Sequence, residues 1–489
     1  MRIASISLTI LLLNIAIPNA GCKPASGPAS IPAVATETDL YAAIEKDDAA
    51  KLAIILDAKP ELLEPKDKEK AVTTPLVAAI RGKKEKSVDL LLTRGADENR
   101  RADSLTPLMW AVLYEHIPIL DRLAKVRPNF SLQDTRGRTV FHYAAAFATK
   151  EGMQTLRNYS MAVDVRDRIG RSALHLLLMR ADDPEICAAF LDRVHGDDLF
   201  GADQFGWTEK HFAAAFHSQY ELINMFNALN VKTKTGKTPL HLACSNGDVK
   251  LIEHLVGYGA DIHAADNRGW QAVDYFKNGS IGNIENKLLG RNSLKEDDIS
   301  ILKKLCKSKD RPETAIHIKN IVRTIDASCG LIMYEMPEFI LWSDGVCLFR
   351  PRETNAPGDS RRISYLKPDE IKFLVSEIEE TGVLTYDSLY SNAAIGSYEI
   401  LEDSELSIHS ESSDGGKVSF SLTLRGPFLM ASRDPWQRLD PKLELDIFEF
   451  RRSLNFVHDL AAATVFHRST EAWKILGEDT EFRGETIRK

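Results

Sequence analysis

The chain has 489 residues, with 62 basic and 70 acidic side chains and therefore a formal net charge of −8. Apolar residues make up 44% of it and charged residues 27%, which is the balance of soluble globular proteins and excludes a wholly disordered chain or a polytopic membrane protein. There is no basic excess of the kind that marks a dedicated nucleic-acid binder, and the six cysteines are too few for a disulfide-built scaffold. At about 150 residues per domain, the length predicts about three domains.

The first residues have the composition of an export signal. Arg2 precedes an apolar stretch at 3–17, which is shorter than the roughly 20 residues of a membrane-spanning helix and is typical of a secretory signal peptide. The segment ends in the tripeptide Ala-Gly-Cys at 20–22. This ending resembles a bacterial lipobox, although that pattern prefers Leu where Asn19 stands.

The lipobox resemblance implies a signal peptide at 1–21 and lipidation of Cys22. The tether that follows, at 22–36, is rich in Pro, Ala, Ser and Gly, a composition that favours an extended chain. The protein is then expected to be exported and held by its lipid on the periplasmic side of a bacterial membrane. Two alternatives stay open, namely an ordinary signal peptide cut near Ala20 and a cytoplasmic regulator whose apolar N-terminus is not a working signal.

The other five cysteines are an odd number and cannot all pair within one chain. Cys187 and Cys244 lie in apolar helical patterns and are expected in the core. A disulfide between two of Cys306, Cys329 and Cys347 stays open in an oxidising compartment.

A motif of about 33 residues recurs through the middle of the chain. One copy reads Thr-Pro-Leu-His-Leu-Ala at 238–243, and shorter forms begin at Thr74, Thr106, Thr139, Ser172 and Thr208. The spacings between successive copies are 32, 33, 33, 36 and 30 residues, and a seventh copy begins at Gly269. A series that keeps its period in this way indicates a stack of structural repeats.

Each copy closely resembles an ankyrin repeat, whose signature is Thr-Pro-Leu-His-x-Ala. The resemblance implies a mainly α solenoid of helix-turn-helix repeats with β-hairpin fingers between them. Thr is expected to cap the first helix of each repeat, with Pro in its first turn. One repeat cannot bury its own apolar face, so neighbours must stack and the ends need caps. A divergent helix pair at 40–56 is expected to form the N-terminal cap.

Four histidines recur at the repeat spacing, namely His142, His175, His211 and His241. The family resemblance implies a structural role, in which each ring bonds backbone of the neighbouring repeat. Successive repeats also place them about 10 Å apart, which is too far for one metal ion. We find no phosphate-binding glycine loop, metalloprotease motif, Cys-x-x-Cys or nucleophile elbow. The sequence therefore predicts no catalytic residue, no metal site and no cofactor.

In ankyrin proteins the fingers and the first helices together form a concave binding surface, which we call the finger face. The fingers here keep an Asp-x-x-Gly frame at 134–137, 167–170, 203–206 and 266–269, and Thr233 replaces Asp in the finger at 233–236. Asp and Gly suit a tight turn, since Asp bonds nearby backbone and Gly accepts a positive φ.

The variable finger positions are basic and aromatic on a chain that is acidic overall. The expected partner-binding residues are Arg136, Arg138, Arg168, Ile169, Arg171, Phe205, Trp207, Lys234, Lys237, Arg268 and Trp270. Arg and aromatic side chains dominate binding hot spots, so we expect the finger face to receive an acidic protein surface or acidic peptide. The alternative is ordinary solvated surface charge.

Beyond residue 316 the pattern changes to a small α+β domain of order β-β-α-β-β-α. Its expected elements are strands at 339–342 and 346–349, a helix at 367–380 that Gly382 ends, strands at 405–409 and 417–424, and a helix at 443–463. Asp-Gly turns join the strands into two hairpins. The pattern Pro337-x-Phe339-x-Leu341-x-x-Asp344-Gly345, followed by Arg350 and by Leu366-x-x-Asp369-Glu370 at the start of the helix, weakly resembles an uncharacterised domain of bacterial exported proteins, which carries no known activity. Asp344 and Asp414 are explained by turn chemistry rather than catalysis.

The sequence thus divides into six expected parts. They are a signal peptide at 1–21, a lipidated tether at 22–36, an ankyrin domain with a cap and about seven repeats at 37–290, a connecting helix at 291–315, an α+β domain at 316–470 and a tail at 471–489. The expected function is a non-enzymatic scaffold that binds another protein and reaches the membrane only through its lipid. The alternative is an envelope enzyme or ligand-binding protein with its site in residues 310–470.

Overall fold

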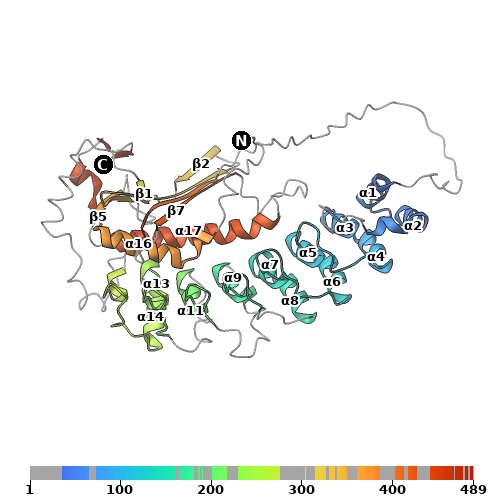
Figure 1. The fold of residues 1–489 in the computed structure, drawn as a ribbon, viewed down its shortest axis with the longest axis horizontal. Helices are drawn as coiled ribbons and strands as arrows, with labels where there is room; N and C mark the ends of the chain where they lie inside the picture. The colour runs from blue at the N-terminus through green and yellow to red at the C-terminus, as the bar shows by residue number, and fades with distance from the viewer. Residues whose placement is uncertain are drawn as a thin grey trace.

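The computed structural model describes residues 36–64, 73–159, 165–180, 186–187, 190, 201–216, 229–275, 303, 314–326, 330–335, 339–349, 361–385, 402–411, 417–426, 441–466, 469–476, 480–482 and 485–487. The N-terminal half is a curved stack of paired helices, and the C-terminal part lies along one side of it (Figure 1). The predicted lipidation site Cys22, the tether and nearly all of the expected connecting helix lie outside the described residues.

The stack pairs a first helix with a second helix in those repeats where the structure describes both. Its described helices are α1 (Glu37–Glu45), α2 (Ala49–Ala58), η1 (Pro60–Leu63), α3 (Pro75–Arg81), α4 (Glu85–Thr93), α5 (Pro107–Leu113), α6 (Ile117–Lys125), α7 (Val140–Phe147), α8 (Lys150–Tyr159), α9 (Ala173–Arg180), α11 (Glu209–Ala215), α13 (Pro239–Asn246), α14 (Val249–Gly257) and η3 (Ala272–Tyr275). Each of the first helices from α3 to α13 begins directly after the Thr or Ser of the motif. The predicted repeat solenoid and its helix starts are therefore confirmed.

Three of the recurring histidines, His142, His211 and His241, tie successive repeats together, as predicted. The backbone N–H of Thr139 donates to Nδ1 of His142 (3.0 Å), so the ring proton is on Nε2, which donates to the carbonyl oxygen of Arg171 in the next repeat (3.1 Å). His241 makes the same contacts, and its Nε2 donates to the carbonyl oxygen of Trp270 (3.1 Å). Burial lowers the pKa of both histidines to about 4. Both rings are therefore neutral structural bridges.

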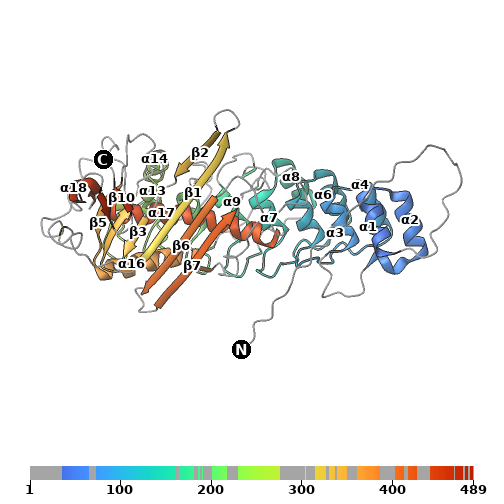
Figure 2. The same ribbon diagram turned by 90° about the horizontal axis from the view of Figure 1, so that it is seen from above.

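The C-terminal part is built on an antiparallel sheet. Its strands are β1 (Thr314–Asp326), β2 (Gly330–Glu335), β3 (Phe339–Trp342), β4 (Val346–Phe349), β5 (Arg362–Tyr365), β6 (Glu402–Glu411), β7 (Lys417–Gly426) and β8 (Thr470–Glu471). The order is β7-β6-β1-β3-β4-β5-β8, with β2 beside β1. The two predicted hairpins, β3–β4 and β6–β7, are confirmed. Strands β1, β2 and β5 were not predicted, and they extend the sheet between and beyond those hairpins (Figure 2).

Both faces of the central sheet are covered. Helices α16 (Pro368–Glu380) and α17 (Pro441–Phe466) pack on one face, and the short η5 (Val383–Thr385) follows α16. The residues expected to form a tail include α18 (Ala472–Leu476), which packs on the other face, and the separate hairpin β9 (Thr480–Phe482) and β10 (Glu485–Ile487). Since alternate residues of β3 and β4 reach opposite covered faces, all of them are buried.

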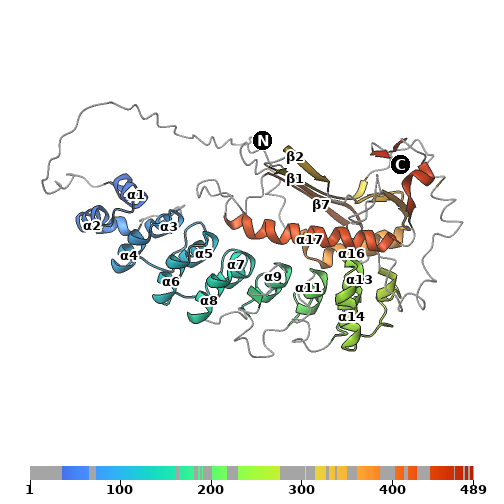
Figure 3. The ribbon, with the colours of Figure 1, turned by 180° about the vertical axis from the view of Figure 1, so that it is seen from behind.

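Helix α17 is shared between the two halves of the molecule and lies between the stack and the sheet (Figure 3). One of its faces, with Phe448 and Phe456, belongs to the core of the repeats. The other, with Phe450 and Val457, belongs to the core beneath the sheet. A helix with two apolar faces must be buried on both. Within the described residues no helix has both the length and the apolar character needed to cross a bilayer.

The predicted positions of the cysteines are confirmed where the structure describes them. Cys187 and Cys244 are buried in the core of the repeats, and burial raises the pKa of the Cys244 thiol to about 12. Cys347 is buried in β4. Cys306 and Cys329, the other members of the open disulfide alternative, lie outside the described residues.

We expect a pH-dependent stability deficit for His241→Gln. An unfolded histidine has a pKa of about 6.5, and the folded pKa of His241 is about 4, so the wild type loses stability as the pH falls from 6.5 toward 4. The variant, which has no such proton to gain, loses nothing at this site. Its deficit in unfolding free energy, about 1 kcal/mol or more at pH 7.5, should shrink on acidification in urea titrations. A deficit that is constant with pH would contradict the neutral bridge, and exposed His263→Gln is the matched control.

Candidate protein-binding surface

Each finger turn is held by its first side chain. Asp134 Oδ1 accepts hydrogen bonds from the backbone N–H groups of Arg136 (2.8 Å) and Arg138 (2.9 Å). Gly137 has φ +84°, and a Cβ there would meet the backbone N of Arg168 at 3.0 Å. Only glycine therefore fits this close approach of neighbouring fingers. The fingers are also linked directly, because the Arg168 N–H donates to the Arg136 carbonyl (2.8 Å).

The turn fixes where the residue after each glycine points. These five residues are Arg138, Arg171, Trp207, Lys237 and Trp270. The first four are at least 97% buried, and every one of those four contacts helix α16, helix α17 or the turn after α16. The finger face is thus covered, over these repeats, by the C-terminal part of the same chain.

The finger at 134–137 meets two carboxylates of α17. Arg138 Nη1 lies 2.6 Å from Asp446 Oδ1 and 3.6 Å from Glu449 Oε1, while its Nε lies 2.9 Å from Asp134 Oδ2. Arg136 Nε adds a contact of 3.0 Å to Asp446 Oδ2. Two arginines from one finger therefore hold one buried aspartate of a helix about 300 residues further along the chain.

The next finger meets both helices. Arg171 Nη1 lies 3.2 Å from Glu449 Oε2 on α17, and its Nη2 donates to the carbonyl oxygen of Thr381 at the end of α16 (2.6 Å). Gly382 has φ +74°, and a Cβ there would come within 2.7 Å of Arg171 Nη2 and 2.9 Å of the Phe205 ring. The predicted glycine end of α16 is confirmed, and it also makes room for the fingers.

A second charged cluster lies beneath α16. Lys237 Nζ pairs with Glu377, and Glu377 Oε1 also accepts from Arg268 Nη2 (3.2 Å) and the Tyr275 hydroxyl (3.1 Å). One turn further along α16, Glu380 accepts a hydrogen bond from the hydroxyl of Thr235 (2.6 Å). Glu377 is thus shared by three donors from two repeats.

Aromatic side chains fill the space between the charged clusters. Trp207 lies edge-to-face with Phe456 of α17, with ring centroids 5.4 Å apart, and Phe147 meets Phe448 in the same way at 5.8 Å. The Arg268 guanidinium lies 4.1 Å from the Trp270 ring and 4.2 Å from the Phe373 ring. These contacts exclude water from the ion pairs, which strengthens them.

The buried carboxylates depend on the finger cations. Burial raises the pKa of Asp446, although Arg138 and Arg136 oppose the rise. Burial, and then the charge of Glu449, raise the pKa of Asp167 to about 7. Because so many acids share this space, removal of one arginine would leave buried negative charge without compensation.

The structure divides the eleven expected partner-binding residues into three groups. Arg138, Arg171, Trp207 and Lys237 are buried, and Arg136, Ile169, Phe205, Arg268 and Trp270 are partly buried. Arg168 and Lys234, at the finger tips, are exposed. The expectation that all eleven present a free surface needs correction, because α16 and α17 cover the bases of the fingers. Binding of a separate acidic protein at these positions stays a prediction.

The acidic side of this interface was not predicted. Asp446, Glu449, Glu377 and Glu380 contact the fingers, and each pair is spaced i, i+3 on its helix. The available signal was a pair of carboxylates three residues apart on a helix, next to apolar residues such as Ile378 on α16 and Phe450 on α17 that are themselves buried. Charged groups in such a helix require cationic partners.

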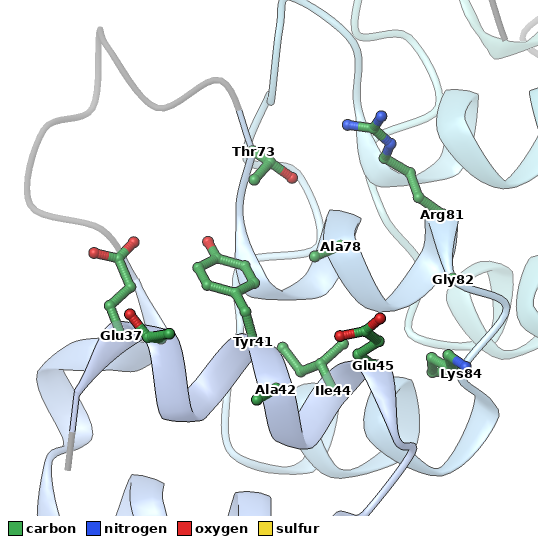
Figure 4. A pocket seen from close by; sticks show the side chains of 11 residues that line it. Glu37, Tyr41, Ala42, Ile44, Glu45, Thr73, Ala78, Arg81, Gly82 and Lys84 are labelled. Carbon is green, nitrogen blue, oxygen red and sulfur yellow. The ribbon is translucent and has the colours of Figure 1, made fainter. Parts of the chain in front are cut away.

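The N-terminal end of the stack has a pocket on the side of the first helices, between α1 and the α3–α4 turn (Figure 4). Its volume is about 750 Å³, and it is lined by Glu37, Thr38, Tyr41, Ala42, Ile44, Glu45, Thr73, Ala78, Arg81, Gly82 and Lys84. Burial, and then the charge of Glu37, raise the pKa of Tyr41, so its hydroxyl keeps its proton. No sequence pattern had marked this site.

We expect Arg138→Ala to destabilise the protein by about 3–5 kcal/mol, since it leaves Asp446 buried without its closest cation. Arg168→Ala, at the exposed tip of the next finger, should change the unfolding free energy by no more than about 0.5 kcal/mol. Urea unfolding monitored by tryptophan fluorescence measures both. Equal effects of the two substitutions would show that Arg138 is solvated and not buried against α17.

Comparisons with known proteins agree with the stack. Residues 222–276 match the family described as ankyrin repeats (many copies). The chain is 28% identical over 169 residues to the nuclear factor NF-kappa-B p105 subunit of Gallus gallus, a match that covers 32% of this chain and 17% of that protein. It is 28% identical over 172 residues to the probable 26S proteasome regulatory subunit p28 of Saccharomyces cerevisiae, covering 34% and 75% of the two chains.

Among solved structures, the ankyrin repeat domain of Bcl-3 is similar, with a TM-score of 0.37 and 20% identity over 42% of this chain and 93% of that one. The present chain thus spans less than a fifth of the chicken relative, and its sheet and helices α16 and α17 lie beyond the ankyrin match at 222–276. What the family match shows in this chain is the ankyrin repeat. The chain contains an ankyrin-repeat solenoid, and ankyrin repeats suggest protein–protein interaction.

Proposed function

We propose that this protein is a non-enzymatic scaffold, held at the bacterial envelope by a lipid on Cys22, that binds another protein through the ankyrin surface. The observation that carries the proposal is the division of that surface. Helices α16 and α17 cover the bases of the fingers from Arg138 to Arg268 and leave the tips exposed, whereas the concave end around α1 and α3 keeps an open pocket. The scaffold therefore combines a closed half with an open half.

The closed half gives the scaffold rigidity. Leu445, Phe448, Phe456 and Leu460 of α17 belong to the core of the repeats, and exposing each large apolar side chain costs about 1.5–3 kcal/mol. A partner could not displace α17 without that cost and the loss of the buried ion pairs. We therefore place the partner on the surface that remains accessible, which includes the exposed finger-tip cations Arg168 and Lys234. Their charge favours an acidic partner.

The alternative of an envelope enzyme or ligand-binding protein requires a polar cleft in the α+β domain. In the described part of that domain, apolar side chains such as Phe339, Leu374 and Leu454 fill the space between sheet and helices. The described residues also contain no group of three or more metal-ligating side chains. This packing favours a domain whose role is to brace the repeats.

The proposal is tested in cells by fatty-acid labelling combined with photo-crosslinking. A photoreactive residue replaces Arg168, Lys234 or Thr38, all exposed on the accessible side, and replaces exposed Glu253 on α14 as the control. We expect the wild type to carry the lipid label and to crosslink one envelope protein from the first three positions and not from the control. Cys22→Ser should lose both label and membrane association.

Two results would contradict the proposal separately. An unlabelled, soluble wild type would exclude the lipid anchor. A partner on this surface would be excluded by either of two crosslinking results. Position 253 would give the same crosslinks as the accessible side, or none of the four positions would give a crosslink.

A further inference from the structure

We propose that the pocket between α1 and α3 is the docking site for an amphipathic helix of a separate protein, one with an apolar ridge flanked by an acidic edge and a basic edge. The inference rests on the proposed scaffold function and names the chemistry of its partner. Three features of the pocket carry it: an apolar floor, charges of opposite sign on its two sides that have no ion-pair partner among the described residues, and continuity with a surface that already holds a helix.

The floor of the pocket is apolar. Tyr41 and Ala42 of α1 and Ala78 of α3 line it, and all three are partly exposed, while Ile44 is buried below them. Tyr41 points into the space between the two helices (Figure 4). A volume of about 750 Å³ accommodates several apolar side chains, and burying each contributes about 1.5–3 kcal/mol.

The two sides carry opposite charge. Glu37 and Glu45 flank Tyr41 on α1, and Arg81 and Lys84 lie across from them at the end of α3 and in the turn that follows (Figure 4). Among the residues that the structure describes, neither glutamate has an ion-pair partner, and neither does Lys84. A ligand that places a cation beside the glutamates and a carboxylate beside Arg81 would satisfy both sides.

Arg81 is already fixed in position. Its Nε donates to the Tyr114 hydroxyl (3.3 Å), and its guanidinium lies 5.1 Å from the centre of the Trp110 ring. Its two terminal nitrogens make no hydrogen bond to a described residue. An arginine that is held by stacking and presents a free fork loses little entropy on binding a carboxylate. Arg81 is therefore expected to be the anchor of the acidic edge.

The same side of the stack holds a helix further along. Helix α17 crosses the first helices from α7 to α13 and is bound through apolar side chains and carboxylates that meet cations of the repeats. The pocket continues this surface past the repeats that α17 covers. We therefore expect the occupant of the pocket to be a helix, because the same side of the stack already binds helix α17.

Three fluorescein-labelled helical peptides test the proposal against the full chain in detergent by fluorescence anisotropy. All share an apolar ridge of leucines, and their edges are one acidic and one basic, both acidic, or both basic. We expect the mixed peptide to bind at least about 10-fold more tightly than the others, equivalent to about 1.4 kcal/mol. An end-for-end rotation exchanges the edges of a helix, so reversed edges are not a useful control.

Variants connect the binding to the pocket. Arg81→Glu and Glu45→Lys should each weaken the mixed peptide about 10-fold or more, and Arg81→Glu should shift the preference to the peptide with two basic edges. Arg101→Glu, the same charge change at an exposed residue outside the pocket, should alter affinity less than about 2-fold. Since Arg81 also contacts Trp110, Glu45→Lys at an exposed position keeps the test independent of folding.

Several results would overturn the inference. They are no saturable binding of any peptide, equal binding of all three, or equal effects of Arg81→Glu and Arg101→Glu. If such a result accompanies specific crosslinks from Arg168 or Lys234 in cells, the scaffold function stands and the pocket is not its docking site. If the peptides bind as expected and no crosslink forms in cells, the pocket inference stands and the envelope function fails.

Discussion

The structure depends on the neutralisation of buried finger cations by carboxylates from the other end of the chain. Arg138 and Arg171 meet Asp446 and Glu449, and Lys237 meets Glu377. Each of these groups is almost fully buried, where an isolated charge would cost several kcal/mol. Exposing these surfaces to solvent would therefore cost free energy for both the repeats and the C-terminal helices. Each half of the molecule thus specifies the position of the other.

Helix α17 joins the repeats and the sheet into one structure. It contributes Phe448 and Phe456 to the core of the repeats and Phe450 and Val457 to the core of the sheet. A repeat stack normally interacts only with neighbours along its axis. Here one helix of 26 residues spans repeats from α7 to α13, so the solenoid gains long-range contacts that would restrict its bending. The open end at α1 and α3 lies beyond this brace.

Local signals in the sequence predicted most of the elements. Thr74 and its equivalents in the other repeats predict helix starts. Their hydroxyl oxygen, or the ring nitrogen of the histidine three residues later, can accept a hydrogen bond from backbone N–H groups that are unpaired at the start of a helix. The Asp-x-x-Gly frame predicts the fingers, and Gly382 predicts the end of α16, because only certain residues suit those turns. The hairpins β3–β4 and β6–β7 follow from Asp-Gly turns. Each of these signals lies within a few residues of the feature that it predicts.

The features that could not be predicted depend on residues far apart in the chain. Strand β1 pairs with β6 more than 70 residues later. Strand β8, which lies where the predicted tail begins, pairs with β5. The finger cations predict a binding surface, but their charge alone does not distinguish a separate acidic protein from Asp446 or Glu377 of the same chain. Likewise, the pocket near Tyr41 arises from the packing of α1 against α3 and has no motif of its own.

The most direct test of the closed finger face is a double-mutant cycle between one finger and α16. Urea unfolding is measured for the wild type, Lys237→Met, Glu377→Gln and the double variant. If the two side chains are paired as the structure has them, the free-energy changes should be non-additive by about 1–3 kcal/mol. Additivity to within about 0.3 kcal/mol would show that the two residues do not interact, and that the finger face is open in solution.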